Sequence, residues 1–244
     1  MRFTIANYHK AKLDIVERIK YSHKWRENEG FIADGVICPS VFEKQSIKIL
    51  CVLAESYGYH DRGCIDIEDQ LKEDLMGLTD PKVKTPRYLA TMLYLLTNSL
   101  QRDVKISLEE WREIPNLFQI REEHTEILQS TLAKIAWVNI KKASNPITRK
   151  NSDLVRSHAR RNKEILRDQI ASIAPDLMII CGNDVFSSLI ELEIIPHACL
   201  QGLPWKIQNY NKCKYIEVSH PACRDWMSYG GLYDIYETIF EQMI

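Results

Sequence analysis

Short runs of apolar residues, each bounded by polar segments, recur along the chain. A strand that is buried on both faces of a parallel sheet leaves this pattern, because neither of its faces meets water. The runs predict four core strands, at residues 47–53, 135–140, 176–181 and 215–218. Each strand is expected to end in a polar loop.

Helical periodicity fills the intervals between these runs. Apolar positions at helical spacing, with Pro or a capping box at the beginning and Gly or Pro at the end, predict helices around the strands. The expected helices cover residues 8–28, 65–75, 86–100, 152–174, 183–192 and 231–244, and Ser107 to Glu110 form a capping box ahead of Trp111. We expect Asn183 or Asp184 to cap the helix after the third strand.

The order of these elements predicts the fold class. Strand and helix alternate from residue 135 onward, which is typical of an α/β fold with a doubly wound, mostly parallel four-stranded sheet and helices on both faces. We expect one domain over residues 1–244, with a helical insertion at about 61–134. Ligands of such sheets bind beyond the carboxyl ends of the strands.

Composition narrows the class of protein. Hydrophobic residues make up 45% of the chain and charged residues 27%, which is ordinary globular usage. The sequence has no apolar run of about 20 residues and no signal-peptide core, so we expect a cytoplasmic protein without membrane contact. The seven cysteines are spread out and never form a Cys-x-x-Cys pair, so we expect reduced thiols and neither a metal nor an iron-sulfur cluster. We also expect a monomer.

Charge is unevenly distributed. A formal net charge of -1 argues against a protein that coats nucleic acid non-specifically. Residues 141–167, however, contain nine basic side chains and only two acidic ones, Asp153 and Glu164. This segment is either a solvated helix face or a phosphate-binding surface.

Three polar residues stand where the predicted strands end. Glu55 follows the first strand, Asn139 lies at the end of the second, and His220 follows the fourth. Each is unremarkable alone, since loop carboxylates, turn asparagines and His-Pro pairs are common. Together, a carboxylate, an amide and an imidazole would converge at one edge of the sheet.

The segments around these residues resemble the uracil-DNA glycosylase superfamily. Residues 52–58 (VLAESYG) are similar to the Gly-Glu-Ala-Pro-Gly motif of one branch, residues 137–142 (WVNIKK) to the strand whose Asn binds the extruded base, and residues 219–222 (SHPA) to the His-Pro-Ser motif. Residues 160–182 look like the helix and strand that lie between them. The resemblance covers residues 47–60 and 135–240.

The chain departs from the family in several places. Ala54, Ser56 and Tyr57 replace Gly, Ala and Pro of the first motif, and the four-cysteine pattern of an iron-sulfur cluster is missing. About eighty residues separate the first two motifs, and so long an insertion is more often functional than idle. An alternative frame aligns Tyr59 and His60 with the Pro-Tyr-His ending of another branch, which puts Tyr57 where that branch has a catalytic Asp.

The resemblance implies roles for the residues at the strand ends. Glu55 would hold the attacking water and stabilise the sugar cation, His220 would donate toward the departing base, and Asn139 would read the edge of the flipped base. The base would also contact Tyr57, Tyr59 and His60. DNA would contact Lys141, Lys142, Arg224, Trp226 and Met227, although Trp226 could equally pack under the last helix.

These roles lead to a function and to competing hypotheses. We expect a DNA glycosylase that removes a uracil-like or modified pyrimidine, such as a hypermodified phage cytosine in antiviral defence, without a cofactor. The sequence places no lysine as a Schiff-base nucleophile, so a monofunctional enzyme is expected. The alternative is a non-catalytic nucleic-acid-binding module of the same fold. A nucleotide-binding protein is disfavoured, because neither Gly-x-Gly-x-x-Gly nor a Walker loop is present.

Overall fold

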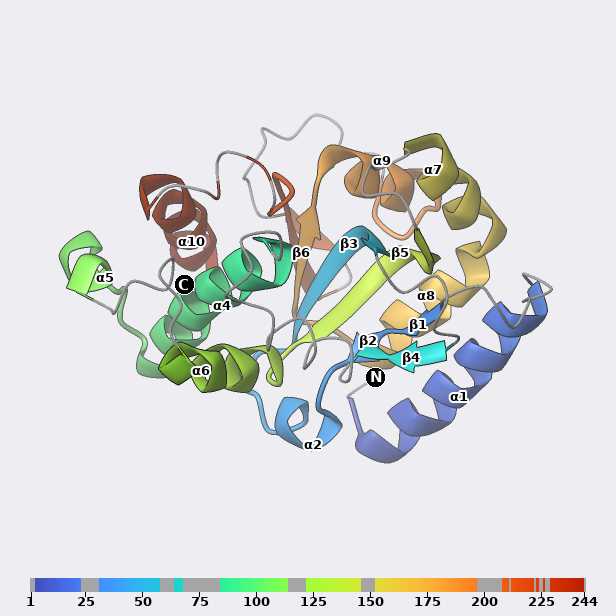
Figure 1. Cartoon of the computed structure of the whole chain (residues 1–244), viewed down its shortest axis with the longest axis horizontal. Helices are drawn as coiled ribbons and strands as arrows, with labels where there is room; N and C mark the ends of the chain where they lie inside the picture. Colours follow the sequence, from blue (N-terminus) through green and yellow to red (C-terminus); the bar gives the residue numbers. More distant parts are fainter. Residues whose placement is uncertain are drawn as a thin grey trace.

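A mostly parallel sheet lies at the centre of the protein in the computed structural model (Figure 1). The structure describes residues 3–22, 31–57, 64–67, 84–113, 122–145, 152–196, 208–210, 212–221, 223, 226 and 229–243. Its core consists of four parallel strands in the order β5-β3-β6-β8: β5 (Ala136–Asn145), β3 (Ile49–Tyr57), β6 (Leu177–Cys181) and β8 (Cys213–Val218). These are the four strands that the apolar runs predict.

Shorter strands extend this core at both sides. The antiparallel neighbours are β1 (Phe31–Ala33) and β2 (Gly35–Val36) beside β5, and β7 (Gln208–Tyr210) beside β8. Strand β4 (Cys64–Asp66) pairs in parallel with β1. Sequence analysis missed these strands because two or three residues are too few for a periodicity. It also placed a helix at 65–75: residues 65 and 66 belong to β4, Ile67 is helical, and residues 68–75 lie outside the described ranges.

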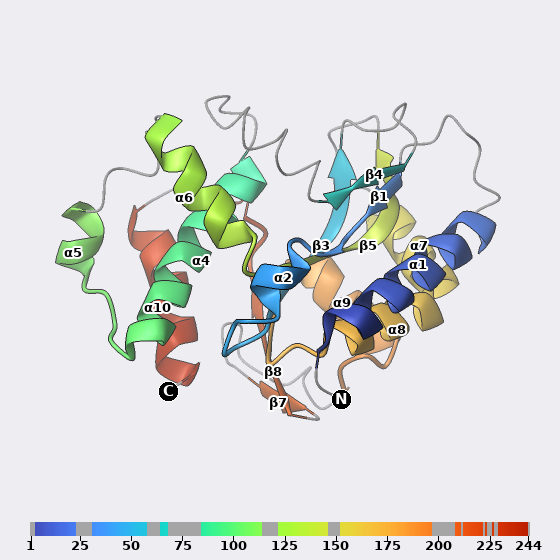
Figure 2. The ribbon, with the colours of Figure 1, turned by 90° about the horizontal axis from the view of Figure 1, so that it is seen from below.

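One face of the sheet is covered by α4 (Lys84–Arg102), α6 (Glu122–Leu132) and α10 (Tyr229–Met243), with α5 (Leu108–Glu113) beyond them (Figures 1 and 2). Leu53, Trp137, Cys181 and Val218 of the sheet belong to the same hydrophobic cluster as the buried residues of these helices. Ser107 caps α5 as expected, since its hydroxyl accepts from the Glu110 N–H at 3.1 Å. We call this side the α4 face.

The other face is covered by α7 (Ser152–Arg161), α8 (Lys163–Ile173) and α9 (Asn183–Glu191), while α2 (Pro39–Phe42) and α1 (Ile5–Ser22) complete the layer. Leu50, Val52, Val138 and Ile180 pack against them in a second cluster. Because side chains alternate along a strand, both faces are apolar, which explains the near-continuous hydrophobic runs. We call this side the α8 face. Helices on both faces confirm the doubly wound arrangement.

Two helix boundaries differ from the expectation. The helix predicted over 152–174 is broken at Asn162 into α7 and α8, and Ala174 ends it in a left-handed conformation, with φ of 48°, before Pro175. Gly182, rather than Asn183 or Asp184, is the N-cap residue of α9, and it makes no side-chain cap. In the described part of the chain, no helix is both long and apolar enough to cross a membrane.

Candidate functional site

The parallel strands place the predicted site residues at one edge of the sheet. Asn139 pairs with Leu53 across β5 and β3, and Cys181 pairs with Val218 across β6 and β8. Val52 pairs with Ile180, so the next residues, Leu53 and Cys181, are also neighbours. One row therefore runs across the four strands near their carboxyl ends.

Glu55 and His220 lie just beyond this row, each two residues further along its chain. Strand β6, between them, has already ended at Cys181. Gly182 follows with a φ of 109°, and a Cβ built on it would lie 3.7 Å from the His220 Cβ. Two strand spacings, about 10 Å, separate the backbones at Glu55 and His220. Gly182, which has no side chain, therefore lies between Glu55 in β3 and His220 in the loop after β8.

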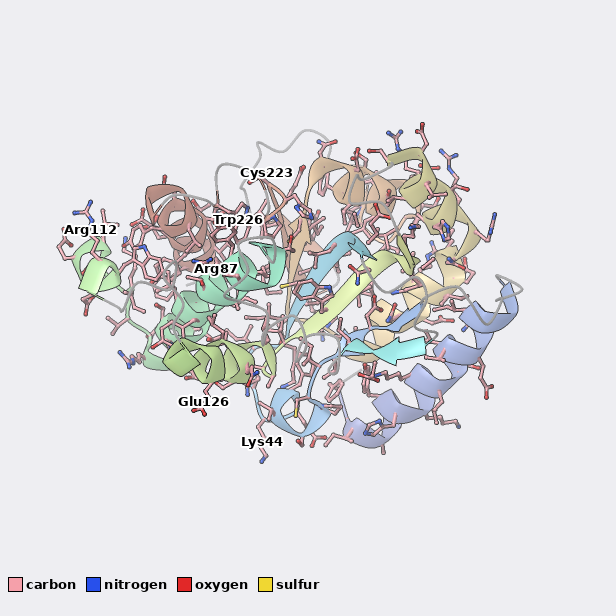
Figure 3. The ribbon with its side chains drawn as sticks, in the orientation of Figure 1. Lys44, Arg87, Arg112, Glu126, Cys223 and Trp226 are labelled. Carbon is pink, nitrogen blue, oxygen red and sulfur yellow. The ribbon has the colours of Figure 1, made fainter. Side chains whose placement is uncertain are left out.

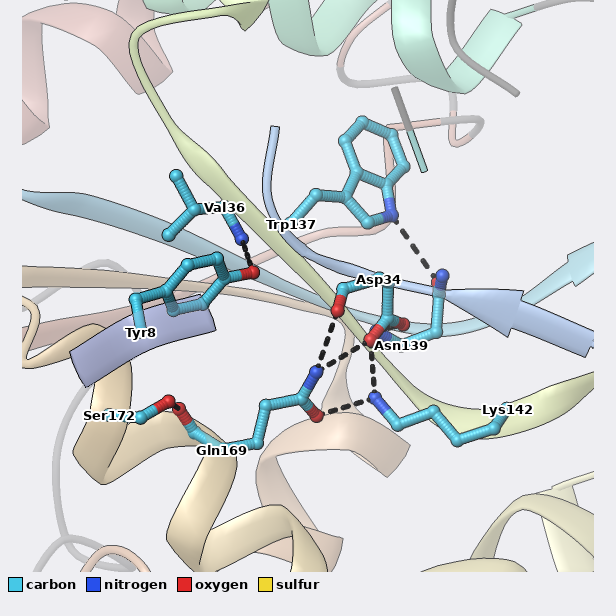
Figure 4. Close-up of polar contacts among 8 residues, drawn as sticks. All are labelled: Tyr8, Asp34, Val36, Trp137, Asn139, Lys142, Gln169 and Ser172. Atoms are coloured by element: carbon cyan, nitrogen blue, oxygen red, sulfur yellow. Dashed lines mark hydrogen bonds and ion pairs between the residues drawn. The ribbon is translucent and has the colours of Figure 1, made fainter. Parts of the chain in front are cut away.

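Asn139 is held from two sides (Figure 4). The Trp137 indole Nε1 donates to the Asn139 side-chain Oδ1 at 3.4 Å, and the Asn139 backbone N–H donates to Asp34 Oδ2 at 2.6 Å. Because the indole N–H of Trp137 can only donate, the atom of the Asn139 amide that faces it is the oxygen. Asn139 is 1% exposed. The contact with Trp137 therefore holds its side-chain amide in place, and the contact with Asp34 holds its backbone.

Glu55 forms a buried ion pair with Lys141. The Lys141 Nζ donates to Glu55 Oε2 at 2.8 Å, and the side chains are 4% and 1% exposed respectively. The two residues are partners in the β3–β5 register, so their side chains leave the sheet on the same face. Sequence reasoning expected Lys141 at a DNA phosphate, but its burial corrects that role. The expectation that no lysine forms a Schiff base stays a prediction.

Lys142 points to the opposite face and joins a closed polar network (Figure 4). Its Nζ donates to Asp34 Oδ1 at 2.6 Å and to Gln169 Oε1 at 2.7 Å. Gln169 Nε2 in turn donates to Asp34 Oδ1 at 2.8 Å and to the Asp34 carbonyl at 3.0 Å. Burial lowers the pKa of Lys142, and the nearby Asp34 carboxylate opposes that shift. An enclosed ammonium cannot reach DNA, so the expected phosphate contact of Lys142 is not retained.

Much of the basic segment is paired with acidic side chains. Arg160 donates to Glu191, and both Lys163 and Arg167 contact Glu193, at 2.9 and 3.3 Å. The ion pair with Glu191 raises the pKa of Arg160. These contacts lie at the surface between α7, α8 and the end of α9. They favour the interpretation of these three positions as a solvated face.

Trp226 is a core residue rather than a wedge for DNA. It is 0% exposed and belongs to the hydrophobic cluster of the α4 face. Its Nε1 donates to the carbonyl of Ser219 at 2.8 Å. Of the two roles that the sequence left open, the structure supports packing under the last helix. The indole also anchors the residue that immediately precedes His220.

Arg87 is a residue that the sequence did not single out. It lies in the first turns of α4 (Figure 3), and Figures 1 and 2 both place this end of α4 on the side where β3 and β5 end. Its Nε is buried and has no hydrogen-bond partner among the described residues, and its guanidinium lies over the Tyr88 ring at 5.8 Å. Desolvation lowers the pKa of Arg87. Arg87 is distinguished by its buried Nε alone, and burial cannot be read from a sequence.

Several expected site residues cannot be placed. Tyr59, His60, Arg224 and Met227 lie outside the described residues, and for Tyr57 only the backbone, at the end of β3, is described. The structure thus brings Glu55 and Asn139 onto the same face of adjacent strands, with His220 at the same edge. The predicted base platform and wedge remain predictions.

Other parts of the described structure offer less chemistry. A cleft of about 920 Å³ lies at the opposite edge, between the beginnings of β6 and β8 and the end of α8. Its walls include Ile170, Met178 and Tyr215, and ligands of doubly wound sheets seldom bind at that edge. Among the residues that are described, no group of three or more His, Cys, Asp or Glu side chains could hold a metal ion.

Compared with known proteins, the chain matches no protein-family model and no curated protein. The geometry at the carboxyl edge of the sheet is therefore the basis for assigning a function.

Proposed function

We propose that this chain is a DNA glycosylase that hydrolyses the N-glycosidic bond of a flipped-out base. The observation that carries the proposal is the shared edge: Glu55 and Asn139 project from one face of adjacent parallel strands, and His220 follows the strand two places away. Gly182 leaves the interval between the carboxylate and the imidazole without a side chain. The resemblance of the three motifs to the uracil-DNA glycosylase superfamily supports the same reading.

Each side chain has a defined task in this reaction. Breaking an N-glycosidic bond builds positive charge on the sugar and negative charge on the base. The Glu55 carboxylate stabilises the sugar cation and orients the attacking water, while His220 hydrogen-bonds the departing base. Asn139, already oriented by Trp137 and Asp34, contacts the base edge. Preorganised polar groups of this kind need little rearrangement when charge develops.

The test is an assay for alkali-labile abasic sites on DNA that contains uracil, deaminated purines or hypermodified phage cytosines. We expect one class to be cleaved, and His220→Ala to lower the rate by about 100-fold or more. Glu55→Gln should do the same. The matched controls are His9→Ala and Glu126→Gln, which alter exposed residues of α1 and α6 and should keep full activity.

Glu55→Gln also removes the counter-ion of Lys141, so loss of activity alone would be ambiguous. The double variant Glu55→Gln, Lys141→Gln restores charge balance and should fold stably while remaining inactive. Full base excision by this double variant would contradict the role of Glu55.

The Glu55–Lys141 pair also favours a second candidate function, a nucleic-acid-binding module without catalysis. In that case the carboxylate is a structural partner of the ammonium. The assay separates the two candidates, because binding of DNA without abasic sites from any of the tested bases supports the module and contradicts the glycosylase.

A further inference from the structure

The cleft at the amino edge of the sheet has the size of a small-molecule site. It measures about 920 Å³ and lies between the beginnings of β6 and β8, the end of α8 and residues 193–195 after α9. Sites for small ligands usually measure about 300–1,000 Å³ and combine apolar walls with a few polar groups. The candidate reaction lies at the carboxyl edge, at the other end of the same strands. A ligand of this cleft would therefore occupy a second site.

The walls of the cleft are mainly apolar and belong to the core. Ile170, Met178, Ile195 and Tyr215 line it and are members of the hydrophobic cluster of the α8 face. Met178 and Tyr215 are partners in the β6–β8 register, so their side chains lie next to each other on this face. Burial raises the pKa of the Cys213 thiol, which also lines the cleft, to about 12, so this thiol is neutral near pH 7. The cleft therefore suits the hydrocarbon body of a ligand.

Four charged residues also line the cleft, and three of them have partners in the protein. Arg167 contacts Glu193 at 3.3 Å, and Asp176 Oδ2 accepts a hydrogen bond from the Lys48 backbone N–H at 2.8 Å. Lys212 is exposed, and it forms no hydrogen bond or ion pair with any residue that the structure describes. Because a lysine side chain is long and flexible, the Lys212 ammonium can reach an anionic group that is bound at the edge of the cleft.

The backbone conformation of Lys212 is unfavourable for a lysine. Lys212 immediately precedes β8 in the hairpin with β7, and its φ is 73°, in the left-handed region where glycine or asparagine would be more stable. Ala174 and Glu193, which line the same cleft, also have left-handed backbones, with φ of 48° and 56°. Residues in such strained conformations often gather at binding sites. Their presence around this cleft therefore supports a functional role for it.

We propose that this cleft binds a small organic monoanion, with its apolar body against Met178 and Tyr215 and its anionic group at Lys212. The apolar walls account for the body, and the ammonium without a partner among the described residues accounts for the charge. Fatty carboxylates and aromatic carboxylates both have this chemistry. The site is separate from the proposed glycosylase and does not depend on it.

The experiment titrates the full chain with two fluorescent probes, anilinonaphthalene sulfonate and phenylnaphthylamine, which share their rings and differ in the sulfonate. We expect saturable binding of both probes. Ala171→Trp places a bulky ring at an exposed position of the cleft wall and should weaken both by about tenfold or more. Lys212→Asn should weaken only the sulfonate probe, by about fivefold, the effect of one exposed ion pair.

The controls separate binding from folding. Asparagine tolerates the left-handed conformation, so Lys212→Asn should keep or raise the urea midpoint while it weakens the sulfonate probe. Lys10→Asn, at an exposed lysine of α1 that does not line the cleft, should bind both probes as the wild type does.

Competition with decanoate and with naphthoate identifies the body of the ligand as fatty or aromatic, according to which carboxylate displaces the sulfonate probe at the lower concentration. The proposal would be overturned if neither carboxylate displaces the probe, or if binding survives Ala171→Trp. Equal affinities of Lys212→Asn and the wild type for the sulfonate probe would also overturn it.

Discussion

Lys141 and Lys142 are consecutive residues of β5, yet they point to opposite faces of the sheet and meet different surroundings. Lys142, on the α8 face, shares Asp34 with Gln169 and with the Asn139 backbone, so that both carboxylate oxygens accept hydrogen bonds. Lys141, on the α4 face, donates to Glu55, its one hydrogen-bond partner among the described residues. Both lysines are buried next to a carboxylate. Within the described part of the chain, the two lysines therefore differ in the number of their hydrogen-bond partners.

The position of each pair in the fold explains this difference. Asp34 lies between β1 and β2, and its partners come from β5 and α8, so the network joins the edge strands to the sheet and to a helix. Fully satisfied buried networks rigidify a structure, and partly satisfied ones are costly. Glu55 and Lys141 lie close to the point where their strands end.

The largest effect is expected from Lys142→Met. The substitution leaves Asp34 as a buried, unpaired carboxylate and removes a partner of Gln169, which should lower the free energy of unfolding by about 3–5 kcal/mol. Urea denaturation followed by circular dichroism measures this change. The control Lys163→Met, at a surface ion pair with Glu193, should cost less than about 1 kcal/mol. Equal losses for both variants would show that the network is not a brace.

A smaller loss of stability is expected from Gly35→Ala, which disturbs the backbone next to Asp34 of the same network. Gly35 has a φ of 142°, and a Cβ there would lie 2.2 Å from the Tyr8 hydroxyl, which accepts the Val36 N–H. Strain of this kind costs about 1–3 kcal/mol, and the displaced hydroxyl adds to it. The matched change is Gly230→Ala in α10, where a Cβ meets nothing within 4 Å. Gly230→Ala should leave the urea midpoint unchanged or raise it, and a midpoint that falls equally in both variants would contradict the explanation.

On the α4 face, Lys141→Met should destabilise by about 3 kcal/mol, the lower end of the range for a broken buried ion pair, because it leaves the buried Glu55 carboxylate without its counter-ion. Urea denaturation of Lys141→Met beside Lys142→Met tests the comparison directly. If Lys141→Met is the more damaging of the two, then the Glu55 pair is also a structural brace.

The sequence predicts the central sheet well because each buried strand leaves a local pattern, a continuous apolar run. The strands around Leu53, Val138, Ile180 and Ile216 are buried on both faces, so each shows a continuous apolar run that needs no tertiary information. The break at Asn162 was not predictable in this way. Its side chain is buried between two helices whose apolar positions continue in helical phase, and only packing shows that the helix is interrupted.

The site was harder to predict than the fold. Alternation of strands and helices predicts parallel strands whose carboxyl ends share one edge, so the sequence could bring Glu55, Asn139 and His220 to that edge. It could not show that Lys141 pairs with Glu55, because that contact depends on the register of β3 against β5. Nor could it show that the network with Asp34 encloses Lys142, since Asp34 lies more than a hundred residues away in the chain. Charge counted along the sequence therefore overestimates the charge that is available to DNA.

The smallest expected effect concerns the arginines on the two faces. Arg87 on α4 has a buried Nε that no described residue hydrogen-bonds, whereas Arg160 on α7 is paired with Glu191. If the carboxyl edge binds DNA from the α4 face, then Arg87 contacts a phosphate and Arg160 does not. Arg87→Gln should reduce the slope of log K against log salt concentration by about 1, the contribution of one phosphate contact.

Fluorescence anisotropy with a labelled duplex, titrated at several salt concentrations, measures this slope. Arg160→Gln serves as the control, because its positive charge is already neutralised by Glu191, and its slope should match that of the wild type. The reverse result would be a smaller slope for Arg160→Gln and an unchanged slope for Arg87→Gln. That result would place DNA on the α8 face. Glu55 and Asn139 would then face away from the nucleic acid, and the proposed glycosylase would lose its geometric basis.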